Sequence, residues 1–171
     1  FYPQTKCLVG TGCVVNPATL SEELDMLAAA GVDTANLFIS ERAQILMPYH
    51  RMLDGLQESA SGSAAIGTTK RGIGPAYSDK SARRGLRMGD LLRSEWLESR
   101  LEQALAFANR ELVHFGQPPL DAGRLFAECL AWRDKLGHRL LDPLPIIRQA
   151  YEQKAHLLLE GQLAAMRDLD W

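Results

Sequence analysis

The sequence has few cysteines and no apolar run of the length that a membrane crossing needs. Cys7, Cys13 and Cys129 form no C-x-x-C pair, which excludes a disulfide framework and a zinc site of the usual spacing. We expect buried thiols in a reducing compartment. No run approaches the roughly 18–20 apolar residues of a membrane span, and we expect no signal peptide, because no charged and then apolar segment opens the given sequence. These absences predict a cytoplasmic protein with no membrane partner.

An excess of one charge is also missing. The 171 residues include 19 basic and 21 acidic side chains, a net charge of −2, so no global positive field attracts nucleic acid. Hydrophobic residues make up 46% and charged residues 23%, which excludes a disordered or collagen-like chain. A chain of this length is expected to bury a sizeable core. Any anionic partner must therefore be bound locally.

Residues 1–60 alternate between strand and helix patterns. Short apolar runs at residues 6–10 and 36–40 predict strands, and an Asn-Pro start signal predicts a helix over residues 18–30 that ends at a glycine. A further helix is expected to begin at Pro48. Strands that alternate with helices predict an α/β fold with a mostly parallel sheet.

Residues 59–90 show no helical or strand periodicity and contain six glycines, which predicts a long functional or disordered loop. Positive charge gathers here: between residues 67 and 93, seven basic residues stand against two acidic ones, a local charge of +5. The basic residues are Lys70, Arg71, Lys80, Arg83, Arg84, Arg87 and Arg93. Cations concentrated where regular structure is missing indicate a local anion site.

The start of this loop, Gly67-Thr68-Thr69, offers free backbone amides and two hydroxyls, which are groups that hold phosphate. It is not a P-loop, because Ile73 stands where that motif requires lysine, and Tyr77 breaks the dinucleotide-binding glycine pattern. From the residues alone, a solvated surface loop is as compatible with the pattern as an anion site. RNA binding is a further alternative, although a single aromatic gives little stacking capacity.

Residues 94–155 predict three amphipathic helices, with apolar stripes over residues 96–115, 125–140 and 146–151, and so a helical insertion. The stripe over residues 96–115 is expected to pack in the core. The run HLLLE at residues 156–160 predicts a short buried strand, with which the chain returns to the sheet over residues 156–171. No histidine has a cysteine or carboxylate partner at ligand spacing, so no metal site is predicted and His50 is expected to be structural.

The run IGTTKRGIGPAYSDKSARRGLRMGDL, from Ile66 to Leu91, closely resembles adenylosuccinate synthetases. The flanking segments GTGCVVNP, PYH-x-x-LD and the Glu-Gly pair at residues 160–161 resemble the same family, so the resemblance spans essentially the whole chain. It implies the P-loop-NTPase-like synthetase fold, with an α/β segment over residues 1–60, an IMP-phosphate loop region over 61–93 and the helical insertion over 94–155.

The resemblance implies a ligase of AMP synthesis that phosphorylates the 6-oxygen of IMP with GTP and lets L-aspartate displace that phosphate. It implies a homodimer that needs Mg²⁺. The family's catalytic aspartate and histidine, and its ligands for GTP and Mg²⁺, fall outside this chain. Because the chain also begins with Phe1 rather than Met, we expect an internal portion of the enzyme that is inactive alone.

Site residues follow from the resemblance position by position. Thr69 corresponds to a threonine that contacts the IMP 5′-phosphate, and Arg83 to an arginine that crosses the dimer interface to the neighbouring subunit's IMP. Thr68 and Lys80 are expected to support the site. The family's IMP-contacting glutamine falls on Leu163 in an ungapped match, or on Gln162 if the backbone shifts by one residue.

Lys70 stands where the family commonly has glycine, which adds positive charge but removes backbone freedom from the loop. The alternative to an enzyme portion is a non-catalytic module whose basic glycine-rich loop binds RNA or an acidic protein.

Overall fold

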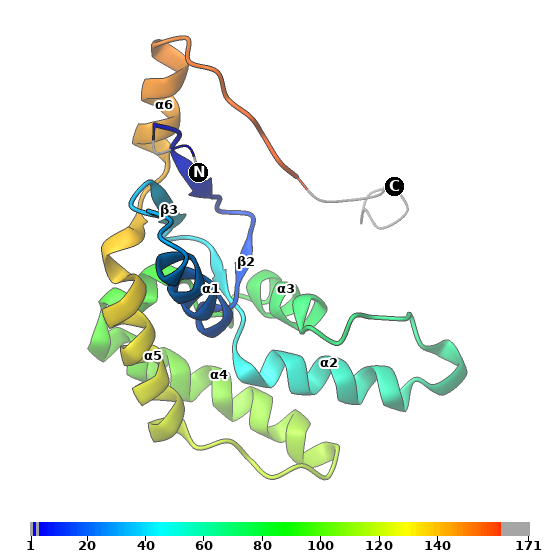
Figure 1. The fold of residues 1–171 in the computed structure, drawn as a ribbon. Coiled ribbons are helices and arrows are strands. Elements are labelled where there is room, and N and C mark those ends of the chain that lie inside the picture. The colour runs from blue at the N-terminus through cyan, green and yellow to red at the C-terminus, as the bar shows by residue number, and fades with distance from the viewer. Residues whose placement is uncertain (1, 3, 162–171) are drawn as a thin grey trace.

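The computed structural model describes residues 2 and 4–161 and contains two small parallel sheets (Figure 1). Strands β1 (Cys7–Val9), β3 (Leu37–Ser40) and β5 (Leu140–Leu141) form one sheet in the order β1-β3-β5. Strands β2 (Val14–Val15) and β4 (Gln44–Ile45) form the other. All three strand pairs are parallel, which confirms the predicted α/β class.

Helix α1 (Pro17–Ala29) forms where the start and stop signals predict it. The Asn16 side chain accepts hydrogen bonds from the N–H groups of Ala18 and Thr19, which would otherwise have no partner in the first turn. Gly31 follows the helix with φ of +74°, a conformation that glycine adopts at little cost. The sequence signals at both ends of this helix are confirmed.

Between residues 94 and 161 the structure has three α-helices, as predicted: α4 (Ser94–His114), α5 (Ala122–Leu136) and α6 (Leu144–Glu152). The buried face of α4 repeats at helical spacing and consists of Leu97, Leu101, Ala104, Leu105, Ala108 and Leu112. Trp96, which the sequence pattern placed in this stripe, is 52% exposed and lies outside the core. The core joins α4 and α5 to the residues around β3 and β4.

The prediction of a structureless loop over residues 59–90 is wrong in its centre. Helix α3 (Ile73–Ser81) forms there, and short 3₁₀ turns span Gly62–Ala64 and Met88–Leu92. The periodicity argument missed α3 because the helix has only nine residues and its buried positions are Ala76 and Asp79. A stripe that contains a carboxylate leaves no apolar pattern to detect.

The prediction of a buried strand over residues 156–160 is also wrong. These residues form no strand, and Leu158 is 95% exposed. A strand needs a neighbour for its backbone hydrogen bonds, and within residues 2 and 4–161 no strand pairs with this segment. The sheet is extended instead by β5, which is two residues long and gave no sequence signal. Gln162 and Leu163 lie outside the described residues.

The cysteines also differ from the prediction. Only Cys129 is buried, on α5, where burial raises the pKa of its thiol to about 12. Cys7, the first residue of β1, and Cys13, in the turn before β2, are both exposed. Among the described residues, no helix combines the length and apolar character needed to cross a bilayer.

Helix α2 (Pro48–Ala60), residues 61–72 and α3 form a hairpin-like arm that extends to one side of the sheets (Figure 1). The tight contact in this arm is at Gly72, directly before α3. Its φ is +85°, and a Cβ placed there would lie 2.7 Å from both Arg51 N and His50 C. Both the backbone conformation and the lack of space require glycine at this position.

We expect Gly72→Ala to lower the free energy of unfolding by roughly 2–4 kcal/mol, because left-handed backbone strain and the clash with α2 add together. The matched control is Gly74→Ala in the first turn of α3, where a Cβ meets no atom within 4 Å. That control should be neutral or slightly stabilising. Urea unfolding of both variants measures the difference, and equal stability would contradict the packing argument.

Candidate functional site

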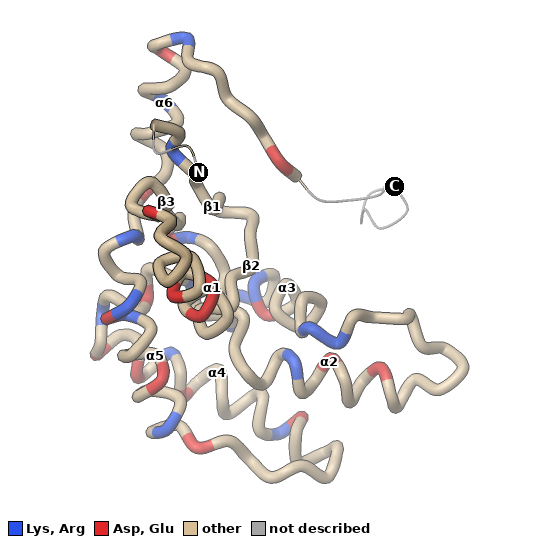
Figure 2. Tube along the Cα trace, in the orientation of Figure 1, with Lys and Arg blue, Asp and Glu red and all other residues tan. Residues whose placement is uncertain are grey.

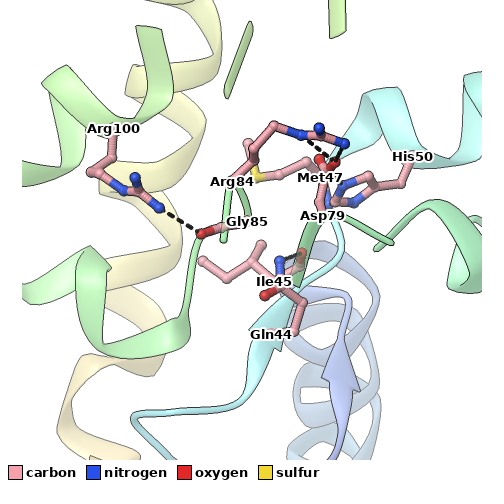
Figure 3. Close-up of polar contacts among 8 residues, drawn as sticks. All are labelled: Gln44, Ile45, Met47, His50, Asp79, Arg84, Gly85 and Arg100. Carbon is pink, nitrogen blue, oxygen red and sulfur yellow. Dashed lines mark hydrogen bonds and ion pairs between the residues drawn. The ribbon is translucent and has the colours of Figure 1, made fainter. Parts of the chain in front are cut away.

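A buried polar network fixes α3 against α2 (Figure 3). His50 is fully buried, and its Nδ1 accepts a hydrogen bond from the Met47 N–H at 3.0 Å. Because Nδ1 is an acceptor, the proton of the neutral ring lies on Nε2, which donates to Asp79 Oδ2 at 3.2 Å. His50 is therefore a neutral hydrogen-bonding residue between two helices, consistent with the structural role predicted for it.

Asp79 connects this network to an arginine. Arg84 donates from Nε and Nη2 to Asp79 Oδ1, at 3.2 Å and 2.9 Å, and its guanidinium lies 3.7 Å from the centroid of the Phe107 ring on α4. Burial tends to raise the pKa of Asp79, but the hydrogen bonds from His50 and Arg84 outweigh burial and hold that pKa below its usual value. Asp79 thus stays ionised and links α2, α3 and α4.

Arg83 follows α3 in a left-handed conformation with φ of +59°. Arg100 on α4 holds this turn, since its Nη2 donates to the carbonyl oxygens of Arg83 and Gly85, both at 3.2 Å. Figure 3 shows the contact with Gly85. The Arg83 side chain is exposed, and no carboxylate of the described residues pairs with it. The turn therefore presents a free guanidinium outward from the end of α3.

The loop before α3 is held by carboxylates. The Glu58 side chain accepts from the N–H groups of Ile66 at 3.3 Å, Gly67 at 2.6 Å and Thr68 at 3.2 Å. The sequence argument treated the amides of this loop as free for phosphate. The structure corrects that expectation, because Glu58 already occupies the amides of residues 66–68.

Thr69 is exposed, as a phosphate contact requires, and lies just after the amides that Glu58 holds. The Thr68 hydroxyl accepts from the Lys70 N–H at 3.3 Å, a contact within the turn itself. Lys70 adopts φ of +54°, a left-handed conformation that glycine adopts more readily. The backbone here thus explains why lysine at position 70 is a costly departure from glycine.

Lys80 lies on α3, and its side chain reaches a neighbouring turn. Its ammonium donates to the Thr11 carbonyl oxygen at 3.1 Å, and the Tyr77 hydroxyl donates to the Gly12 carbonyl oxygen at 2.7 Å. Both contacts tie α3 to the turn between β1 and β2. Lys80 therefore positions the helix, and its charge also faces the Tyr77 ring at 5.7 Å.

Cations gather at both ends of α3 (Figure 2). Lys70 and Arg71 precede the helix, and Arg83 follows it. The structure does not bring Thr69 and Arg83 together, because the nine residues of α3, a length of about 13 Å, stand between them. Within residues 2 and 4–161, no group of three His, Cys, Asp or Glu side chains could hold a metal ion.

Comparison with known proteins places this arrangement in a family. The family model for adenylosuccinate synthetase matches residues 1–171. The chain belongs to the adenylosuccinate synthetase family. It is 42% identical over 172 residues to an adenylosuccinate synthetase of Dehalococcoides mccartyi, covering 100% of this chain and 41% of that protein. It is 43% identical over 163 residues to adenylosuccinate synthetase 1 of Methanosarcina acetivorans, covering 95% of this chain and 38% of that protein.

The fold agrees with the family assignment. A structure described as fully ligated adenylosuccinate synthetase from Plasmodium falciparum superposes with a TM-score of 0.83 and 28% identity, covering 99% of this chain and 39% of that one. The chain thus spans about two fifths of the length of the relatives it matches. Membership of a ligase family favours the enzyme portion over the non-catalytic module that the basic loop had left open.

Several residues of the site were not found from the sequence. Glu58 and Asp54 are spaced four apart on α2, directly before the glycine-rich loop, and this spacing puts both carboxylates on one helix face. That pattern could have indicated their role. The pairing of His50 with Asp79, and of Arg100 with the Arg83 turn, joins residues far apart in the chain and left no local pattern.

We expect the protein to lose stability in acid through Asp79. Because its folded pKa lies below its ordinary value of 3.8, the stabilisation is complete above that value and disappears as pH falls through the lower, folded pKa. Asp79→Asn should therefore flatten the decline in unfolding free energy between pH 5 and about pH 2.

The matched control for this experiment is Asp134→Asn, because Asp134 pairs with Arg133 on the surface with its side chain 69% exposed. The control should keep the acid dependence of the unmodified protein in urea unfolding at each pH. An identical decline in Asp79→Asn and the unmodified protein would show that the Asp79 network does not contribute.

Proposed function

We propose that this chain forms the part of an adenylosuccinate synthetase that holds the IMP phosphate and contributes an arginine to a second subunit. The synthetase would join IMP and L-aspartate at the expense of GTP, through 6-phosphoryl-IMP, to give adenylosuccinate, GDP and phosphate. The observation that carries the proposal is the pair of exposed groups, the Thr69 hydroxyl and the Arg83 guanidinium, held at opposite ends of the anchored helix α3.

Thr69 is suited to phosphate because its hydroxyl donates a hydrogen bond without adding charge. Lys70 and Arg71 come next in the chain and are both exposed, so two cations stand beside the hydroxyl. A phosphate dianion gains charge-assisted hydrogen bonds from such groups. This end of α3 would bind and orient the nucleotide, and would leave the purine ring to other parts of the synthetase.

Arg83 is suited to act on a neighbouring copy. It lies the whole length of α3 away from the Thr69 of its own chain, so a phosphate bound at Thr69 is not next to it. Its side chain points outward and, among the described residues, forms no ion pair. In a two-fold symmetric dimer, each Arg83 would reach the phosphate of the other subunit. Arginine keeps its charge at any working pH, which suits it to an anion contact.

The residues that the structure describes do not account for phosphoryl transfer. No group of three His, Cys, Asp or Glu side chains among them could hold Mg²⁺, so we assign Mg²⁺ and the GTP phosphates to parts of the synthetase beyond the described residues. The chain's own residues would bind, orient and help neutralise IMP. The exposed free thiols Cys7 and Cys13 fit a reducing cytoplasm.

We expect IMP to protect the backbone of residues 63–85 from hydrogen exchange, and inosine to protect it far less, because only IMP carries the phosphate. Hydrogen exchange detected by mass spectrometry on a synthetase that contains this segment measures the effect. Residues 122–136, on α5, provide an internal control whose exchange should not respond to either compound. Equal protection by the two compounds would rule out phosphate recognition by the loop.

We expect Thr69→Ala to raise the KM for IMP by about tenfold, and Arg83→Ala to raise it by about 10- to 100-fold. Both variants should change the KM for GTP less than the KM for IMP. Mixing the two variants tests the cross-subunit contact. A mixed dimer regains one intact site if Arg83 serves the other subunit, so on the order of a quarter of the sites recover after random exchange. No recovery on mixing would place Arg83 and Thr69 in the same subunit's site.

A further inference from the structure

Two carboxylates on one face of α2 hold the two ends of the loop that carries Thr69. Asp54 and Glu58 lie one helical turn apart. Asp54 Oδ2 accepts from the Gly72 N–H at 2.8 Å in a buried contact, at the end of the loop. Glu58 accepts from the N–H groups of residues 66–68, at its beginning. Thr69 lies in the short arch between the two contacts.

We propose that Asp54 and Glu58 form a clamp that sets the loop in its binding shape before the nucleotide arrives, and that Glu58 is a positioning residue for the phosphate of IMP. This inference rests on the proposed function, because it assumes that Thr69 contacts the phosphate. Glu58 acts through the backbone and needs no contact with the nucleotide.

The geometry favours a clamp for three reasons. The contact from Gly67 is short, at 2.6 Å, as expected when a carboxylate accepts from an N–H group. Gly67 adopts φ of +80°, which lets successive N–H groups turn toward a single anion. Both carboxylates also project from a helix that is fixed at its first turn by the contacts of His50, so the clamp has a rigid base.

The position of Glu58 also separates it from the phosphate-binding groups. Its carboxylate is bound to the amides of residues 66–68, whereas the hydroxyl of Thr69 and the cations Lys70 and Arg71 follow in the chain. A loop already ordered by protein groups loses less conformational freedom when the ligand binds. The clamp would therefore strengthen IMP binding, even though it places a negative charge in the loop.

If Glu58 blocked the phosphate site instead of shaping it, its removal would change IMP binding in the opposite direction. If Glu58 were an internal substitute for phosphate that must leave the amides before IMP binds, removing it would strengthen IMP binding. A clamp weakens IMP binding when Glu58 is removed. The sign of the change in the KM for IMP thus separates the two.

The test compares Glu58→Ala, Glu58→Gln and the control Gln57→Ala in a synthetase that contains this segment. Gln57 is the exposed neighbour on the same helix, and its side chain makes no hydrogen bond to the described residues. We expect Glu58→Ala to raise the KM for IMP about tenfold with the KM for GTP unchanged. Glu58→Gln should recover part of this loss, because its amide oxygen still accepts from the loop N–H groups. Gln57→Ala should match the unmodified enzyme.

Hydrogen exchange without IMP separates the clamp from the nucleotide site. Glu58→Ala should speed exchange at residues 66–68 and leave the amides of α5 unchanged, which also shows that the variant is folded. Unchanged exchange at residues 66–68, or a lower KM for IMP, would overturn the clamp. Faster exchange with an unchanged KM for IMP would overturn the positioning role if Thr69→Ala still raises that KM. If Thr69→Ala also leaves the KM for IMP unchanged, the proposed contact between the loop and the phosphate is overturned, and with it the positioning role that rests on that contact.

Discussion

The hydrogen bond between His50 and Asp79 determines where the candidate site lies. It joins the first turn of α2 to α3 in a buried environment, where a lost partner would leave an unpaired polar group. The backbone of His50 also packs against Gly72 so closely that no side chain fits there. Since the loop with Thr69 ends at Gly72 and the Arg83 turn begins after α3, this one junction positions both exposed groups.

Two of the three non-glycine residues with positive φ among the described residues lie next to those groups. Lys70 and Arg83 both adopt left-handed conformations without being glycine, which costs of order 1–3 kcal/mol at each. Each is held by contacts from a neighbour: the Thr68 hydroxyl accepts from the Lys70 N–H, and Arg100 donates to the Arg83 carbonyl. Such positions persist when the surrounding structure determines them, and here they direct a lysine and an arginine outward at opposite ends of α3.

The sequence predicted elements with local signals and missed those defined by distant contacts. Asn16 and Gly31 marked the ends of α1 because capping is a local interaction. Helix α3 escaped detection because its buried face includes Asp79, and β5 because two residues carry no periodicity. Residues 156–160 looked like a buried strand, yet a strand forms only beside a partner that the pattern itself does not supply. Thr69 and Arg83 came from resemblance, whereas the pairing of His50 with Asp79 joins residues far apart in the chain and arises only through folding.

The helical insertion holds the turn that carries Arg83. Phe107 and Arg100 both project from α4, and they hold Arg84 and the carbonyl of Arg83 at the end of α3. The core that α4 shares with α5 makes that surface rigid. A guanidinium that must reach another subunit needs a fixed origin, because each rotatable side chain ordered on contact weakens binding. The packing of α4 therefore serves the proposed dimer contact by fixing the backbone from which Arg83 extends.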